Sequence, residues 1–155
     1  MNLKTLIRLK AASGKSEPVR RNLFDEANAP MYLRYIAMTS QAATESDWMV
    51  TDDGRTFSMP VKPNTDYAVS VFNTSVSIFR VACLTVDPST VGDEETLHSY
   101  NTKAFNTGRT GTIKTGANEK WIVIQVNKTY AENRNAKIQV EYGTVKTEPY
   151  EPYIH

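Results

Sequence analysis

The chain is a succession of short segments rich in β-branched and aromatic residues, each bounded by a cluster of turn-forming residues. In one of them Tyr67, Val69 and Val71 share one face of an extended chain, while Ala68 and Ser70 share the other. This period of two residues is typical of a half-buried strand. The same pattern, with turn residues as boundaries, predicts strands at 31–38, 56–61, 66–72, 77–85, 110–115, 120–126 and 136–142.

Most connections between these segments are too short for the crossover helix that parallel neighbours require, so antiparallel pairing is expected. The predicted fold class is all-β, an antiparallel β-sandwich of the jelly-roll type, with an immunoglobulin-like Greek key as the alternative. Helix is confined to one or two turns in each of the windows 26–29 and 40–47, because neither sustains a long apolar stripe.

At 155 residues the chain fits one domain, which we place at 22–155, preceded by a short N-terminal arm at 1–21. The arm carries four Lys or Arg residues before its first acid, Glu17, and then a joint containing Gly14 and Pro18. It is interpreted as an anchor to a neighbouring subunit, and the alternative is a first strand of the sandwich at 3–9. The residues expected to make the anchor are Leu3, Leu6, Ile7, Arg8 and Leu9.

The charge of the chain is almost balanced, with 18 basic and 17 acidic residues and a formal net charge of +1. No global field would therefore draw it to nucleic acid or to an anionic membrane. No apolar run approaches the roughly 20 residues of a membrane-spanning helix, so membrane insertion is not expected. The N-terminus breaks its apolar residues with charges, unlike a signal peptide.

Residues that could carry catalysis are few and poorly placed. His98 stands in a polar stretch, His155 ends the chain, and Cys83 lies in an apolar run that predicts a buried, unreactive thiol. Asp52-Asp53-Gly54-Arg55 precedes a strand and is interpreted as a tight hairpin-type turn rather than a calcium loop. We expect no catalytic site, no metal site and no cofactor, and hence a protein that is not an enzyme.

Sugar recognition needs only an aromatic platform with polar neighbours, and leaves no strict spacing in a sequence. The candidate carbohydrate-binding residues are Trp48, Tyr100 and Tyr130, of which Trp48 and Tyr130 are expected in loops. Partial burial as a loop anchor is the alternative for these two. Trp121 begins a regular apolar strand and is expected to belong to the core.

The C-terminal segment carries two prolines and two tyrosines, Pro149, Tyr150, Pro152 and Tyr153. The prolines remove backbone donors and favour an extended chain, so the segment cannot continue a sheet ladder. Its aromatic content favours a tail docked on the domain over a disordered one, with Tyr150 and Tyr153 buried against the sandwich.

This ending resembles that of phage tail, baseplate and fibre modules with a carbohydrate-binding-like β-sandwich, in which the last strand runs into Glu-x-Gly-Thr and then Thr-Pro-Tyr-Glu-Pro-Tyr. The matching stretches are Glu141-Tyr142-Gly143-Thr144 and Thr147-Glu148-Pro149-Tyr150-Glu151-Pro152-Tyr153, where Glu148 interrupts the Thr-Pro step. Further matches are Asn22-Leu23-Phe24-Asp25, the usual start of the module, and an early strand-turn-strand at 57–67.

The resemblance implies a non-enzymatic structural or accessory protein of a bacteriophage virion, a tail, baseplate or fibre component anchored through its N-terminal arm. The alternatives are a carbohydrate-binding module for adsorption to the host surface, and a capsid decoration or head-fibre protein. The implied partners are other virion proteins, several copies of the chain in a symmetric assembly, and host cell-surface polysaccharide. The implied location is the virion, after synthesis in the host cytoplasm.

Overall fold

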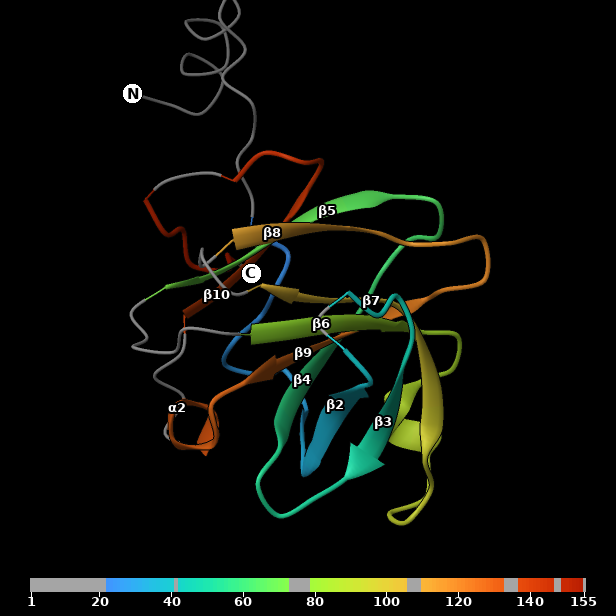
Figure 1. The fold of residues 1–155 in the computed structure, drawn as a ribbon. Helices are drawn as coiled ribbons and strands as arrows, with labels where there is room; N and C mark the ends of the chain where they lie inside the picture. The colour runs from blue at the N-terminus through green and yellow to red at the C-terminus, as the bar shows by residue number, and fades with distance from the viewer. Residues whose placement is uncertain are drawn as a thin grey trace, which may run out of the picture.

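The computed structural model describes residues 22–40, 42–72, 79–105, 110–132, 137–146 and 149–154, with the side chain of Tyr130 left out. These residues are almost entirely strands joined by turns (Figure 1). The elements are β1 (Met31–Tyr32), β2 (Arg34–Met38), β3 (Ser46–Val50), β4 (Arg55–Pro60), β5 (Asp66–Phe72), β6 (Phe79–Leu84), η1 (Pro88–Thr90), β7 (Leu97–Phe105), β8 (Thr110–Lys114), β9 (Trp121–Val126), α2 (Lys128–Glu132) and β10 (Lys137–Tyr142).

The strands form an antiparallel sandwich. A seven-stranded sheet has the order β1-β4-β9-β6-β7-β3-β2, and a three-stranded sheet has the order β10-β5-β8. Strand pairing is nested about the connection from β6 to β7: β6 pairs with β7, β5 with β8, and β4 with β9. Nested pairs that alternate between two sheets are the wrapped-hairpin arrangement of a jelly roll, so the predicted fold class is confirmed.

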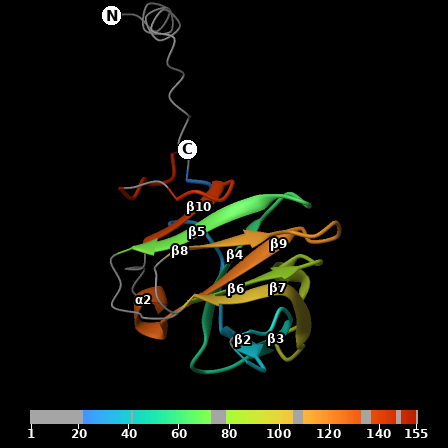
Figure 2. The same cartoon turned by 45° about the horizontal axis from the view of Figure 1, so that its top comes forward.

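The middle of the large sheet is buried on both faces. From β9, Ile122 and Ile124 face the core shared with the three-stranded sheet, whereas Val123 faces a second core that contains Ile36 of β2 and Trp48 of β3. The large sheet therefore curls so that β2 and β3 cover its outer face (Figures 1 and 2). Strands covered on both faces need apolar residues at nearly every position, which explains the apolar runs 81–84 in β6 and 121–124 in β9.

The large sheet curls along the long strand β7, which pairs with β3 over its first residues and with β6 over its last. Its first residues pair with β3, Ser46 opposite Ser99, and its last residues pair with β6, Phe79 opposite Phe105. Near the start of the stretch that pairs with β6, Asn101 has a φ of +48°, and the register with β6 shifts between Val81 and Cys83. Such irregularities bend a strand and increase its twist, so one strand can leave one layer and enter another.

At the ends that the structure describes, the predicted strands are present with shifts of at most one residue, apart from 31–38, which is split at the exposed Leu33. Residues 77, 78 and 136 of two predicted strands lie outside the described residues. Two strands were missed. Residues 46–50 form β3, so the helix expected at 40–47 is wrong at its end, and β7 lies in a stretch where no strand was expected. At 26–29 a single turn does form, in which Ala29 N donates to the carbonyl oxygen of Asp25 at 2.8 Å.

The free edge of β10 is covered by the first segment, residues 22–25. Leu23 N donates to the carbonyl oxygen of Val140 at 2.8 Å, and the buried Asn22 side chain donates to Ile138 O and accepts from Val140 N. An uncovered edge would offer unpaired backbone groups to other chains. The first segment therefore closes the three-stranded sheet at this side.

The C-terminal tail docks beside the first segment (Figure 2). The Tyr150 hydroxyl donates to Glu26 Oε2 at 3.1 Å, its ring packs on Phe72 with centroids 5.6 Å apart, and Glu151 N donates to Gln139 Oε1 at 2.8 Å. The docked tail is thus confirmed, although Tyr150 and Tyr153 are half-buried rather than buried. Within the described part of the chain, no helix is long and apolar enough to span a membrane.

Candidate functional site

Trp48 is wrong as a carbohydrate platform, because its side chain has no exposed surface. It lies in β3 rather than in a loop, its indole Nε1 donates to Thr56 Oγ1 at 3.1 Å, and its ring meets that of Tyr32 edge-on at 5.2 Å. The Arg34 guanidinium covers the ring at 4.4 Å. Trp48 is therefore the centre of the second core and cannot stack on a ligand.

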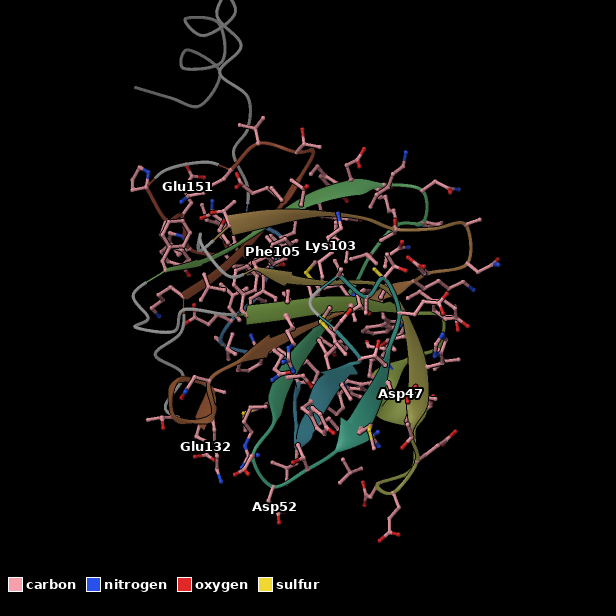
Figure 3. The ribbon with its side chains drawn as sticks, viewed as in Figure 1. Asp47, Asp52, Lys103, Phe105, Glu132 and Glu151 are labelled. Carbon is pink, nitrogen blue, oxygen red and sulfur yellow. The ribbon has the colours of Figure 1, made fainter. Side chains whose placement is uncertain are left out.

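Tyr100 is half-buried on β7, in a polar exposed neighbourhood. Its ring meets the His98 ring edge-on at 4.9 Å, and His98 lies between two carboxylates, Glu45 Oε2 at 3.2 Å and Asp47 Oδ1 at 3.5 Å. Figure 3 shows that Asp47, which marks this cluster, lies far from Glu151, which is bonded to Gln139 of β10. The ring partner of Tyr100 is therefore His98, and the carboxylates beside it contact both ring nitrogens of His98 rather than leave them as donors for a sugar.

The remaining predicted residues do not complete a site. Tyr130 lies in the short helix α2 rather than in a loop, and α2 is tied to β4 by the ion pair of Glu132 with the buried Arg55 at 2.7 Å. The structure therefore distributes Trp48, Tyr100 and Tyr130 over β3, β7 and α2 and does not assemble them into one platform. The anchoring residues of the arm, at 3–9, lie outside the described residues.

One groove combines an exposed aromatic residue, Tyr142, with a cation, Lys62, and the sequence did not predict it. It lies where β4 and β10 end and β5 begins, and its volume is about 320 Å³. A volume of this size is at the lower end of the range for ligand pockets. The residues that line it are Leu23, Met59, Pro60, Val61, Lys62, Tyr67 and Tyr142.

Two tyrosines and a lysine define the polar and aromatic part of this groove, which we call the Tyr142 groove. Tyr142 is 53% exposed, and the centroid of its ring lies 5.4 Å from that of the buried Tyr67, with the two rings tilted by 35°. Lys62 Nζ lies 5.2 Å from the centroid of the Tyr142 ring and forms no ion pair with a described residue. Burial raises the pKa of the Tyr67 hydroxyl above its ordinary value, so this hydroxyl stays protonated at neutral pH.

Hydrogen bonds on both sides of Lys62 fix the loop that carries it. Lys62 N donates to the Tyr67 hydroxyl oxygen at 2.8 Å, and Lys62 O accepts from the buried Thr115 Oγ1 at 2.7 Å. The same Thr115 hydroxyl oxygen accepts from Thr65 N, and Asn64 turns the chain with a φ of +50°. Because its backbone is held in this way, Lys62 needs to order only its side chain to meet a ligand.

In a second groove, at the other end of the large sheet, two of the polar side chains bond to the edge of β2. Arg80 Nη1 donates to the carbonyl oxygen of Ile36 at 2.9 Å, and Gln125 Oε1 accepts from Ile36 N at 2.8 Å. These two bonds cover the free edge of β2. We therefore assign this groove to closure of the fold rather than to a ligand.

The groups screened for catalysis have structural surroundings. Cys83 is buried as expected, and burial, strengthened by the neighbouring Glu119, raises the pKa of its thiol, which keeps it unreactive. Glu119 itself accepts two hydrogen bonds from Asn101 Nδ2, at 2.7 and 2.8 Å, which hold the bend in β7. Asp52 and Asp53 do form a tight connection, but β3 and β4 on either side of it do not pair, so the hairpin is wrong.

The loop after η1 is likewise fixed by structure rather than by chemistry. Arg34 is buried, and its guanidinium donates to the carbonyl oxygens of Gly92 at 2.7 Å and of Glu95 at 2.5 Å. Burial lowers the pKa of Arg34, and the nearby carboxylates of Asp93 and Glu95 oppose this. The acids of this loop therefore balance a buried cation.

Within the part of the chain that the structure describes, no three His, Cys, Asp or Glu side chains are grouped to hold a metal.

The sequence contained one signal for the Tyr142 groove. Tyr142 continues the alternation of Ile138 and Val140, which are buried, and the same pattern predicts an inward side chain for it. As the last residue of β10, however, it projects beyond the rim of the core. The chain matches no protein-family model, no curated protein and no solved structure.

Proposed function

We propose that the chain is a non-enzymatic structural or accessory protein of a bacteriophage virion, a tail, baseplate or fibre component. The proposal starts from the resemblance of its first segment and its ending to phage modules with a carbohydrate-binding-like sandwich. The jelly-roll fold has the architecture expected of such a module. Fold alone does not identify a function, so the proposal depends on where the matching residues lie.

The observation that carries the proposal is that the two matching segments, although more than a hundred residues apart, meet on the β10 side of the domain. Asn22 of the first bonds to Ile138 and Val140 of β10, the strand that runs into the second, and Tyr150 of the second bonds to Glu26, which follows the first. The sequence separations of these bonds are 116, 118 and 124 residues. The resemblance then concerns a packed seam of the fold and not two unrelated stretches.

The same seam places residue 22, where the N-terminal arm joins the domain, at one edge of the three-stranded sheet (Figure 2). A domain held through residues 1–21 would keep the opposite layer, β2 and β3, away from its attachment. Other virion proteins and further copies of the chain are the proposed partners of the arm. Repetition in a symmetric particle would add avidity to weak contacts.

The test is incorporation into particles during infection of cells that supply tagged protein. The full chain is compared with a version of residues 22–155 and with a full-length variant in which Leu3, Leu6, Ile7 and Leu9 are all replaced by Ser. We expect the full chain in purified particles and both altered versions depleted. Absence of the full chain would refute the virion role, and equal incorporation of all three would refute anchoring by the arm.

Carbohydrate binding is the second candidate function, and one observation favours it. The Tyr142 groove presents the exposed residue Tyr142 beside an ammonium group and above an apolar floor. Aromatic side chains with an apolar body and a polar end are enriched where proteins meet amphipathic partners. A capsid decoration or a head fibre remains an alternative position in the particle for the same domain.

A further inference from the structure

Two polar side chains of the Tyr142 groove, Lys62 and Tyr67, are available to a ligand as hydrogen-bond donors at neutral pH. Lys62 contributes an ammonium group, which is donor-only. The Tyr67 hydroxyl oxygen already accepts from Lys62 N at 2.8 Å, and no described residue accepts its proton. Tyr67 is 1% exposed, so this proton can be directed only into the groove or toward the backbone around it. A ligand that completes the groove must therefore supply acceptors.

The apolar part of the groove sets a second requirement. Leu23, Met59 and Val61 provide a floor without hydrogen-bonding side chains, and the exposed Tyr142 ring forms one wall. Aliphatic C–H groups pack well against such a surface and against an aromatic face. The ligand should thus have one apolar face and, on another side, oxygen acceptors.

The charge in the groove selects among such ligands. Lys62 has no described carboxylate as a partner, and its Nζ is positioned over the Tyr142 ring rather than over an acid. A bound anion would replace this weak contact with a charge-assisted hydrogen bond, which is roughly twice as strong as a neutral one. A neutral sugar would leave the ammonium uncompensated as water is displaced from it.

We propose that the Tyr142 groove binds an acidic pyranose of a polysaccharide, with the carboxylate toward Lys62 and Tyr67 and the C–H face of the ring against Tyr142. The inference rests on the second candidate function, carbohydrate binding, and does not depend on particle assembly. It names the class of sugar and the residues that select it.

The experiment titrates the full chain with trigalacturonate and with sialyllactose, beside their neutral counterparts, the trigalacturonate methyl ester and lactose. Binding is followed by calorimetry and by the NMR signals of the tyrosines. We expect at least one acidic probe to bind at least about tenfold more tightly than its neutral counterpart, as one charge-assisted hydrogen bond allows. Its affinity should fall as salt is added, because exposed charges are screened.

Two substitutions at exposed positions test the assigned residues. Lys62→Gln should weaken binding of the acid about tenfold and leave that of the neutral probe unchanged. Tyr142→Ala should weaken both about fivefold or more. The matched controls are Lys103→Gln, which removes the same charge from β7, and Tyr100→Ala, which removes the aromatic residue expected from the sequence. Melting curves establish that each variant is folded.

The outcomes separate the two levels of the proposal. Binding of neutral probes as tightly as acidic ones, or insensitivity of acid binding to Lys62→Gln, would refute selection of an acidic sugar but would leave carbohydrate binding in place. Binding lost in Tyr100→Ala and kept in Tyr142→Ala would move the site to β7 and overturn the assignment of the groove. Failure of the full chain to bind any of the four probes at millimolar concentration would overturn both.

Discussion

Replacing Asn22 by alanine should be among the most damaging changes of a single polar side chain in the domain. Its Oδ1 accepts from Phe24 N at 3.0 Å and from Val140 N at 2.9 Å, and its Nδ2 donates to Ile138 O at 3.0 Å. The side chain is 1% exposed, so water cannot take over these bonds without opening the seam. Asn22→Ala would leave three backbone groups without partners.

The expected loss of stability follows from these three bonds. Each contributes a net 0.5–1.5 kcal/mol in ordinary surroundings, and a buried group left unsatisfied costs about 1–3 kcal/mol. Three lost bonds therefore give a decrease of roughly 1.5–4.5 kcal/mol in the free energy of unfolding, and three unsatisfied groups would give roughly 3–9 kcal/mol. We expect about 3 kcal/mol, which is a large part of the 5–15 kcal/mol that stabilises an ordinary domain.

The assay is urea unfolding followed by tryptophan fluorescence. With a slope of about 1–3 kcal/mol per molar urea, the midpoint should fall by roughly 1–3 M at an unchanged slope. The matched control is Asn28→Ala, because Asn28 is exposed and bonds only to the side chain and backbone of Asp25. If the two variants lose the same stability to within about 0.5 kcal/mol, the seam on β10 does not stabilise the fold as reasoned.

Three further predictions concern other parts of the fold. A Cβ at Gly54 would lie 2.5 Å from the carbonyl oxygen of Arg34, so Gly54→Ala should lower the stability measured by thermal unfolding by about 1–3 kcal/mol. The control Gly92→Ala, whose Cβ would lie 4.0 Å from its nearest neighbour, should cost little, and equal effects of the two variants would contradict the close approach. Trp48→Phe should lower stability by about 1–3 kcal/mol, because the buried indole loses its hydrogen bond. It should leave any sugar binding intact, because Trp48 has no exposed surface, and reduced binding by a folded variant would refute this. Burial, reinforced by the nearby Glu26, raises the pKa of Tyr150 to about 12. The unfolded chain ionises at about 10, so stability should fall as pH rises from about 10 to about 12, and Tyr150→Phe should flatten this dependence. An equally steep dependence in the variant would show that another group causes it.

Periodicity predicted the strands that bury ordinary hydrophobic residues and missed those that bury hydroxyls. In β3 and β7, Ser46 Oγ contacts Ser99 Oγ at 2.6 Å and Thr102 Oγ1 at 2.8 Å, and all three side chains are buried. These hydroxyls satisfy one another, so the interior between the two strands looks polar in the sequence. Asp47 is exposed on the other side of β3, and Val50 is exposed at the end of the strand.

The candidate site was less predictable than the fold because it depends on tertiary position. Trp48 has polar neighbours in the sequence, yet β2 and the large sheet enclose it. Tyr142 has apolar neighbours at alternate positions, yet it ends its strand at the rim. Lys62 becomes a candidate ligand-binding residue only because Tyr67 and Tyr142 lie beside it, and the pairing of β5 with β10 brings these two tyrosines together. Spacing along the chain encodes none of these three arrangements.

The seam on β10 also determines how the domain would respond to mechanical load. A pull on the chain at Asn22 is borne first by the side-chain bonds of Asn22 to Ile138 and Val140 and by the bond from Leu23 N. Phe24, the first residue of the main core, is loaded only after these bonds part. In a domain tethered through residues 1–21, the first segment would therefore detach from β10 and extend before Phe24 is pulled from the core. Force spectroscopy on the tethered protein should record this early, small extension as an event separate from unfolding.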